Sequence, residues 1–314
     1  MTGGIIRRQL SCSGMELSHG IPPDRPDRKF YKYMSAEIAK KVLEKSSLRW
    51  AKPTLFNDPF DVQFDLRVEY DRNRVVEKAL QNAVDLYMGR RHMPRDGNRL
   101  AAGIRILQMK APGLKEEELK AKLRDGMLQG MDKLEKNIPR NHEEIRAVLS
   151  NFKLLCFSEL YDNILMWAHY AKAHTGAVLE FSYVEKLDSA WGAAKPVKYR
   201  KEMPYLVNEE KLVKVLSGEG TIATPDLFEE AVYVKALDWA YEKEWRLVGG
   251  WEHDKTEEYI AFAPEEMTGI HLGCRMSEAD RKAIGDLAAK KFGHASIYAG
   301  AKSGSRFAVE FTQV

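Results

Sequence analysis

A long block with helical periodicity, from about Asp71 to Ser150, separates segments that otherwise look like strands and short helices. The segments RNRVVEKALQNAVDLYMGR and LKEEELKAKLRDGMLQGMDKLEKN carry apolar residues at helical spacing, many charges and few strand-forming residues. Strand-like segments precede this block and resume at KLLCFSEL. Because strands and helices are mixed without the regular alternation of a doubly wound sheet, the sequence predicts an α+β fold with mixed or antiparallel central sheets.

The predicted organisation is one α+β domain over residues 29–314, with a helical insert at about 71–150. Residues 1–28 contain no continuous apolar core, so they are a poor signal peptide and are expected to form a flexible arm. The charge runs of the insert are typical of solvated helix faces. We expect the insert to contact the target, a second copy of the chain or a cognate regulator.

The composition excludes some classes of protein. The 49 basic residues nearly balance the 46 acidic ones, for a net charge of +3, so charge alone does not predict nucleic-acid binding. No segment approaches the roughly 18 apolar residues of a membrane span, so no membrane association is expected. The three cysteines, Cys12, Cys156 and Cys274, are too far apart for a disulfide framework or a zinc pattern, which favours the cytoplasm.

Several local signals predict where elements begin and end. Ser35, followed by Glu37 and apolar residues at helical spacing, indicates a helix start. The tripeptide at 57–59, Asn-Asp-Pro, predicts a turn that either shapes a pocket rim or is purely structural. The alternation in FDVQFDLRV predicts a strand after it. Ser277 is the predicted cap of a late helix.

The segment YDNILMWAHYAKAHTGAVLEF predicts a helix followed by a strand. Asp162 stands where an N-cap is expected, and the helix is predicted to run to His174, with Gly176 just after its end. Four residues at helical spacing are then expected on one face: Asn163, Trp167, Tyr170 and His174. His169 is predicted to be either a general base or, more commonly for such a residue, a structural group.

The stretch DWAYEKEWRLVGG, residues 238–250, sets paired carboxylates among aromatic rings. As an extended strand it would place Glu242, Glu244 and Arg246 on one face, with the glutamates ~7 Å apart. The other face would carry the core residues Trp239, Tyr241, Trp245 and Leu247. The charged face lines either solvent, where its ion pairs add little stability, or a cleft. The aromatic segments FYKYMS and MWAHY favour the cleft.

Taken in order, YKYMS, LFNDPFD, LLCFSE, ILMWAHYAKAHTGAVLEF and YEKEWRLV resemble the bacterial and phage-borne family catalogued as domain of unknown function 2971 (DUF2971). The resemblance extends from Phe30 to about Gly273. The helical block is the variable part of such proteins, and the family label assigns no activity.

The order of elements is also similar, more distantly, to that of mono-ADP-ribosyltransferases. This resemblance implies a related fold, NAD as the substrate that supplies ADP-ribose, and a Glu-x-Glu pair at 242–244. It implies that Glu244 is the catalytic acid, that Glu242 orients the substrate, that Lys32 or Tyr33 occupies the first-strand position and that Tyr170 is the aromatic shelf. The segment FYKYMS holds neither the Arg nor the His usual at that first strand. The other residues predicted to bind the cofactor are Ser35, Asn57, Trp167, His169 and Arg246.

The chemistry implied is cleavage of the bond between nicotinamide and ribose, which passes through an oxocarbenium-like cation that a carboxylate stabilises. No Rossmann or P-loop glycine pattern is present, and no metal site is expected, because His169 and His174 are five apart. The resulting hypothesis is an NAD-dependent ADP-ribosyltransferase-like toxin or defence enzyme acting on nucleic acid or protein. The alternatives are a hydrolase or nuclease using Asp58, His169 and the two glutamates with a metal, and a non-catalytic ligand sensor.

Overall fold

The computed structural model describes residues 28–63, 66–95, 97–220, 224–250 and 254–314. The predicted arm at 1–28 lies outside the described residues except for Arg28. The chain divides into two compact units. Of the described residues, unit 1 comprises those within 28–63, 151–201 and 233–314, and unit 2 comprises those within 66–150 and 202–232. Both helices and a mixed, mainly antiparallel sheet are present, so the α+β class is confirmed.

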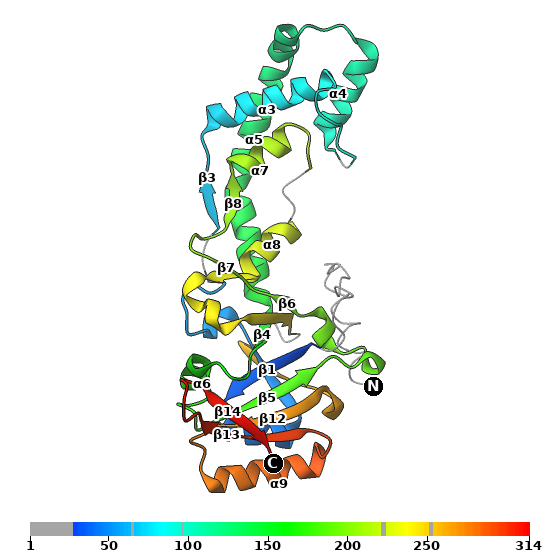
Figure 1. Ribbon diagram of the computed structural model, residues 1–314. Coiled ribbons are helices and arrows are strands. Elements are labelled where there is room, and N and C mark those ends of the chain that lie inside the picture. The colour runs from blue at the N-terminus through cyan, green and yellow to red at the C-terminus, as the bar shows by residue number, and fades with distance from the viewer. Residues whose placement is uncertain (1–27, 64–65, 96, 221–223, 251–253) are drawn as a thin grey trace. The chain divides into compact units, whose positions relative to one another are not determined.

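Unit 1 is built on a sheet that contains ten strands within the described residues. Eight of them follow the order β11-β2-β4-β1-β5-β12-β13-β14, and β10 pairs with β4 and with β6. Their bounds are β1 Lys29–Met34, β2 Ser47–Ala51, β4 Lys153–Ser158, β5 Ala177–Ser182, β6 Lys195–Pro196, β10 Glu244–Gly249, β11 Glu257–Ala261, β12 Met267–Leu272, β13 Ser296–Lys302 and β14 Val309–Gln313. Figure 1 shows β1, β5, β12, β13 and β14 side by side.

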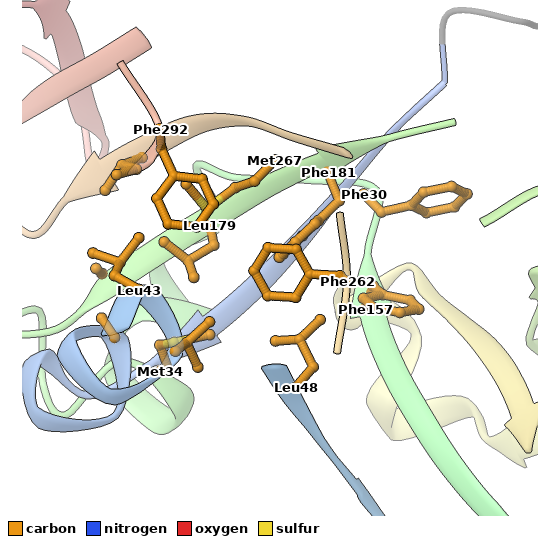
Figure 2. Packing of buried hydrophobic residues seen from close by; sticks show 14 of the residues in the cluster. Phe30, Met34, Leu43, Leu48, Phe157, Leu179, Phe181, Phe262, Met267 and Phe292 are labelled. Atoms are coloured by element: carbon orange, nitrogen blue, oxygen red, sulfur yellow. The ribbon is translucent and has the colours of Figure 1, made fainter. Parts of the chain in front are cut away.

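One face of this sheet carries the main core of unit 1. Alternate residues of the strands, among them Phe30, Leu179 and Trp245, point to this face because successive strand side chains alternate. Helix α2 (Ala36–Lys45) and helix α9 (Glu278–Lys291) cover it with buried aliphatic residues. Figure 2 shows the resulting packing of phenylalanine, leucine and methionine side chains. The predicted caps of the two helices, Ser35 and Ser277, are confirmed.

The opposite face carries the short helix α6 (Ile164–Tyr170) and a second cluster of rings. Asn163, not Asp162, is the N-cap, since its side chain accepts hydrogen bonds from the amides of Leu165 and Met166. The helix ends at Tyr170, so the predicted continuation to His174 is wrong. Its last expected turn is replaced by backbone with positive φ at residues 172–174.

Close backbone packing explains this early end. Gly176 donates a hydrogen bond to the carbonyl of Ala171, and a Cβ on Gly176 would lie 2.1 Å from the carbonyl oxygen of Met34. The chain therefore turns sharply to enter β5 beside β1. The sequence predicts Gly176 as the residue that ends the helix. The structure requires glycine at this position because any side chain would collide with β1.

The sheet forks at β4. One edge of β4 pairs with β10 along its whole length, from Ser158 opposite Glu244 to Lys153 opposite Gly249. Its other edge is shared, because β1 meets it at Ser158 and β2 meets it at Leu154. Between these two points the Lys32 ammonium of β1 donates to the carbonyl of Cys156, at 2.7 Å. The fork leaves space between β1 and β2 that a continuous sheet would fill.

Unit 2 holds the helical block. The helices of this block are α3 Arg72–Tyr87, α4 Arg99–Lys110 and α5 Glu116–Asn151. The block does not complete the unit, which also includes β8 Tyr205–Asn208, α7 Glu209–Leu216 and α8 Thr224–Val232. Strand β3, Arg67–Glu69, pairs with β8 in parallel.

The strand predicted over FDVQFDLRV is mostly wrong. Residues 60–63 form a turn and bends, residues 64–65 lie outside the described ranges, and only Arg67–Glu69 is a strand. Asp61 and Val62 are buried in the bend, and Val62 has a positive φ of 61°, so this segment does not run along a sheet.

Candidate functional site

A pocket of about 910 Å³ lies in unit 1 at the fork of the sheet. Ligand pockets typically measure roughly 300–1,000 Å³, so this one has room for a large nucleotide. Its wall is formed by β1, α2 and β2 on one side, with β4 next to them. The other side is formed by α6, the segment 55–61 and the residues around Glu242.

The carboxylate segment is not one strand. Residues Leu237–Glu242 form a 3-10 helix, Lys243 has a positive φ of 46°, and β10 begins at Glu244. The predicted alternation therefore holds only from Glu244 onward. There Trp245 and Leu247 enter the core, while Glu244 and Arg246 point to the other face. The predicted placement of Trp239 and Tyr241 with Trp245 is wrong, because both belong to the helix.

The two glutamates nevertheless meet at one ammonium group. Lys235, from β9 (Val234–Ala236), places its Nζ 2.5 Å from Glu242 Oε2 and 2.9 Å from Glu244 Oε2. The two carboxylates reach the same ammonium because the 3-10 helix ends at Glu242 and Lys243, with its positive φ, separates it from β10. Strand β9 is held by parallel pairing with β7, Lys198–Arg200.

Arg246 and Asp61 complete the buried ion network. Arg246 is fully buried and donates from Nε to Glu244 Oε1 at 2.7 Å. Its Nη2 contacts both oxygens of Asp61, at 2.7 and 2.8 Å. Asp61 also lies 3.4 Å from the ammonium of Lys235. Three carboxylates and two cations thus share one enclosed space.

Glu242 differs from Glu244 in its remaining contact. Its Oε1 accepts a hydrogen bond of 2.6 Å from the hydroxyl of Tyr170, a neutral donor, whereas both oxygens of Glu244 contact cations. The backbone of this segment is also fixed. The Ser158 hydroxyl donates to the Glu242 carbonyl at 2.6 Å, and the Glu244 amide donates to the Tyr199 hydroxyl at 2.7 Å.

These contacts move the two pKa values in opposite directions. Burial alone would raise the pKa of Glu244, but the charges of Arg246 and Lys235 outweigh it and hold that pKa well below its usual range. Burial raises the pKa of Glu242, and the negative charge of Glu244 adds to this, although Lys235 opposes it. Carboxylates with diverging pKa values are typical of sites where one stays ionised and the other exchanges a proton.

Cations line the side of the pocket formed by β1, α2 and β2. Lys32 is half-buried, and burial lowers the pKa of its ammonium. Lys41, Lys45 and Arg49 lie at the exposed rim. Lys41 pairs with Glu37 and Arg49 pairs with Glu257, so part of this charge is already balanced. The arrangement suits a ligand that carries negative charge at one end.

The structure brings several of the predicted binding residues together and separates others from the pocket. Lys32, Tyr33, Asn57, His169 and Tyr170 line it together with the two glutamates.

The remaining predicted residues serve other contacts. Ser35 caps α2 by accepting from the Ile38 amide. Trp167 is fully buried among rings and donates to the carbonyl of Tyr161, so its place is in the core. Arg246 is behind the pocket wall, where it holds Glu244. Asp58, considered for a hydrolase, accepts from the Phe60 amide within its own turn.

Sequence reasoning missed Asp61, Lys235 and Tyr199. Asp61 belongs to the segment LFNDPFD, in which only the turn residues before it carry a recognisable local signal. Lys235 is a single charge in the apolar run AVYVKAL, and a lysine predicted to be buried needs an acidic partner. That requirement was the available signal, although it does not say which carboxylate provides the partner.

Two further observations concern metal and membrane binding. Within the described ranges, no group of three or more His, Cys, Asp or Glu side chains is arranged to hold a metal ion. Among the helices that the structure describes, none combines the length and the apolar character needed to cross a bilayer.

Comparison with known proteins gives one match. A family model described as a protein of unknown function, DUF2971, matches residues 166–247. None of the curated proteins or solved structures compared with the chain matches it. The matched range contains Tyr170, Lys235 and both glutamates, whereas the segments YKYMS, LFNDPFD and LLCFSE precede it. Over residues 166–247 the chain therefore matches the DUF2971 family, as the sequence resemblance predicted.

Proposed function

We propose that this pocket binds NAD and that the chain cleaves its nicotinamide–ribose bond, as an ADP-ribosyltransferase-like enzyme. The observation that carries the proposal is the pair of carboxylates, Glu242 and Glu244, held with opposite pKa shifts at the wall of a pocket of about 910 Å³. A reaction that develops positive charge on a sugar carbon is accelerated by an ionised carboxylate near that carbon.

Glu244 is proposed as the electrostatic stabiliser. Its contacts with Arg246 and Lys235 keep it ionised across the physiological range. They also fix its orientation, so no side-chain reorganisation is needed when the cation develops. Glu242, whose pKa is raised, is proposed to accept the proton of the attacking group.

The rest of the pocket suits the rest of the ligand. The cations at the rim, Lys41, Lys45 and Arg49, match a pyrophosphate. The rings of Tyr170 and Trp239 offer surfaces for nicotinamide stacking. The fork between β1 and β2 supplies a cleft within the sheet, which supports the proposed likeness to the ADP-ribosyltransferase fold and needs no glycine-rich loop.

A toxin or phage-defence role in the bacterial cytoplasm is proposed from the family resemblance and the cysteine usage, and the ADP-ribose passes to protein, to nucleic acid or to water. The helical insert at about 71–150, which lies in unit 2, is the proposed surface for a target, a second copy or a regulator.

The test is incubation of the full chain with NAD, followed by quantification of free nicotinamide. Glu244→Gln should lower its release by on the order of 10²–10⁴-fold, because the developing cation loses its counter-charge. Glu180→Gln is the matched control, since Glu180 is also buried and ionised but does not line the pocket. Equal rates for the wild type and Glu244→Gln would refute the proposal.

One observation favours a second candidate, a non-catalytic sensor. Both oxygens of Glu244 already contact cations of the same chain, so its charge is balanced before any ligand binds. A sensor would bind NAD without releasing nicotinamide. Calorimetric titration of NAD alongside the release assay separates the two functions, because binding without release supports the sensor.

A further inference from the structure

The position between the two glutamates is already occupied by the chain itself. The ammonium of Lys235 contacts Glu242 at 2.5 Å, Glu244 at 2.9 Å and Asp61 at 3.4 Å, and its side chain is 6% exposed. The ring of Trp239 lies 5.1 Å from the same Nζ, so a cation–π contact adds to the three carboxylates.

Binding of an external cation between Glu242 and Glu244 would carry a large free-energy cost. A guanidinium or ammonium that bound both glutamates would have to displace Lys235, which would leave its buried charge without its partners. Removing one partner from a buried ion pair is strongly unfavourable. Backbone pairing of β9 with β7 fixes the residue that carries this ammonium, so Lys235 has little freedom to move aside.

The oxygen of Glu242 that does not contact Lys235, Oε1, is suited to a neutral nucleophile. This oxygen accepts from the Tyr170 hydroxyl, and both Glu242 and Tyr170 line the pocket. A carboxylate can act as a general base and take the proton of a neutral hydroxyl group. A guanidinium stays protonated, so it would bind to this carboxylate through its charge.

We propose that the acceptor in this pocket is water rather than a guanidinium or amine, so that the reaction is hydrolysis of NAD. This inference rests on the function proposed above and concerns only its second substrate. Nicotinamide leaves with the electron pair of its bond to C1′, the oxygen of water forms the new bond to C1′, and the water proton passes to Glu242. The products are ADP-ribose, nicotinamide and a proton. Lys235 is a positioning residue in this reaction.

The experiment uses agmatine as the guanidinium probe. The full chain is incubated with NAD, with and without millimolar agmatine, and nicotinamide, free ADP-ribose and ADP-ribosyl-agmatine are quantified. Equal amounts of nicotinamide and free ADP-ribose, unchanged by agmatine, are expected. An agmatine adduct that exceeds free ADP-ribose would overturn the acceptor assignment while leaving NAD cleavage intact. If no nicotinamide is released at all, the proposed function itself fails and the acceptor assignment fails with it.

A binding measurement tests the occupied position without turnover. Calorimetric titration of the wild type with agmatine should show no binding at millimolar concentration. Lys235→Gln opens the carboxylate pair and should bind agmatine at least tenfold more tightly than the wild type. Circular dichroism and a melting curve show whether this variant folds. If Lys235→Gln does not fold, the titration of the wild type still tests the proposal. Agmatine binding to the wild type that is lost in Glu242→Gln would contradict it.

Discussion

Unit 1 buries two carboxylates with lowered pKa values, Glu244 and Glu180, on the same face of its sheet, and only one of them lines the pocket. Glu244 lies at the wall of the pocket, held by Lys235 and Arg246. Glu180, on β5, accepts from the Thr268 hydroxyl at 2.7 Å and contacts Lys29 at 2.7 Å, and it does not line the pocket.

The ring system beside Glu180 explains this second arrangement. His271 lies between Tyr161 and Tyr298, with ring centroids 4.6 and 4.7 Å away, and its Nε2 is 3.4 Å from Glu180. These rings pack beside the Glu180 carboxylate, which does not line the pocket. A buried charge with a shifted pKa is therefore not sufficient to mark a ligand site, and access from a pocket distinguishes the two groups.

The largest expected effect is on the stability of the pocket network. Arg246→Met should lower the free energy of unfolding by about 3–5 kcal/mol, because Asp61 and Glu244 then share an enclosed space with one cation fewer. Urea unfolding followed by circular dichroism measures this. A loss below about 1 kcal/mol would indicate that water reaches these carboxylates, as at a surface ion pair.

The Glu180 group should show its effect through pH. Burial alone would raise the pKa of Glu180, but hydrogen bonds from His271, Lys29 and Thr268 lower it from 4.5 to about 2. A lowered pKa contributes stability that is complete above pH 4.5 and is lost as the pH falls toward 2.

Glu180→Gln should therefore be less stable than the wild type by up to about 3 kcal/mol at pH 7, with the difference shrinking between pH 4.5 and 2. Unfolding curves across this range measure it, and NAD consumption should be unchanged. A pH-independent difference would contradict the assignment of the effect to this carboxylate.

A smaller effect separates positioning from stability at the pocket. Tyr170→Phe removes the hydroxyl that donates to Glu242 and should cost about 1–2 kcal/mol of stability. Because that hydrogen bond lowers the pKa of Glu242, its loss should raise this pKa further. The acid limb of the pH–rate profile for nicotinamide release, where Glu242 must be ionised, should then move to higher pH. An unmoved limb would exclude Glu242 as the base.

The smallest effect is expected at the rim. Lys45 is exposed at the end of α2 and lines the pocket, so Lys45→Ala should change stability by less than about 0.5 kcal/mol. It should weaken NAD binding by about two- to fivefold, and less at high salt, because an exposed cation is screened. Lys201→Ala, an exposed lysine that does not line the pocket, is the matched control. Equal losses in both variants would remove the rim from the proposed site.

Local sequence signals predicted elements well where the hydrogen bonds of the backbone are made to residues nearby in the chain. The Ser35 and Ser277 caps depend on hydrogen bonds within three residues, so sequence spacing is sufficient to identify them. The alternation from Glu244 to Leu247 was also readable, because it depends on the geometry of one strand.

Signals failed where a distant contact decides the local conformation. The helix after Asn163 ends at Tyr170 because Gly176 must approach Met34 of another strand. The residues Leu237–Glu242 form a 3-10 helix, and from its end Glu242 contacts Lys235 of β9 and Tyr170 of α6. Neither partner could be identified from the spacing of residues within the segment itself.

The sequence by itself therefore determined the α+β class, the helical block, several helix starts and the presence of paired carboxylates beside aromatic rings. Only the tertiary structure decided that one ammonium, from Lys235, joins Glu242 to Glu244, and that Asp61 shares Arg246 with Glu244. The physical reason is that periodicity and capping depend on neighbours along the chain. The partner of a buried charge is chosen by which strands the sheet places together, at separations in sequence that no local pattern records.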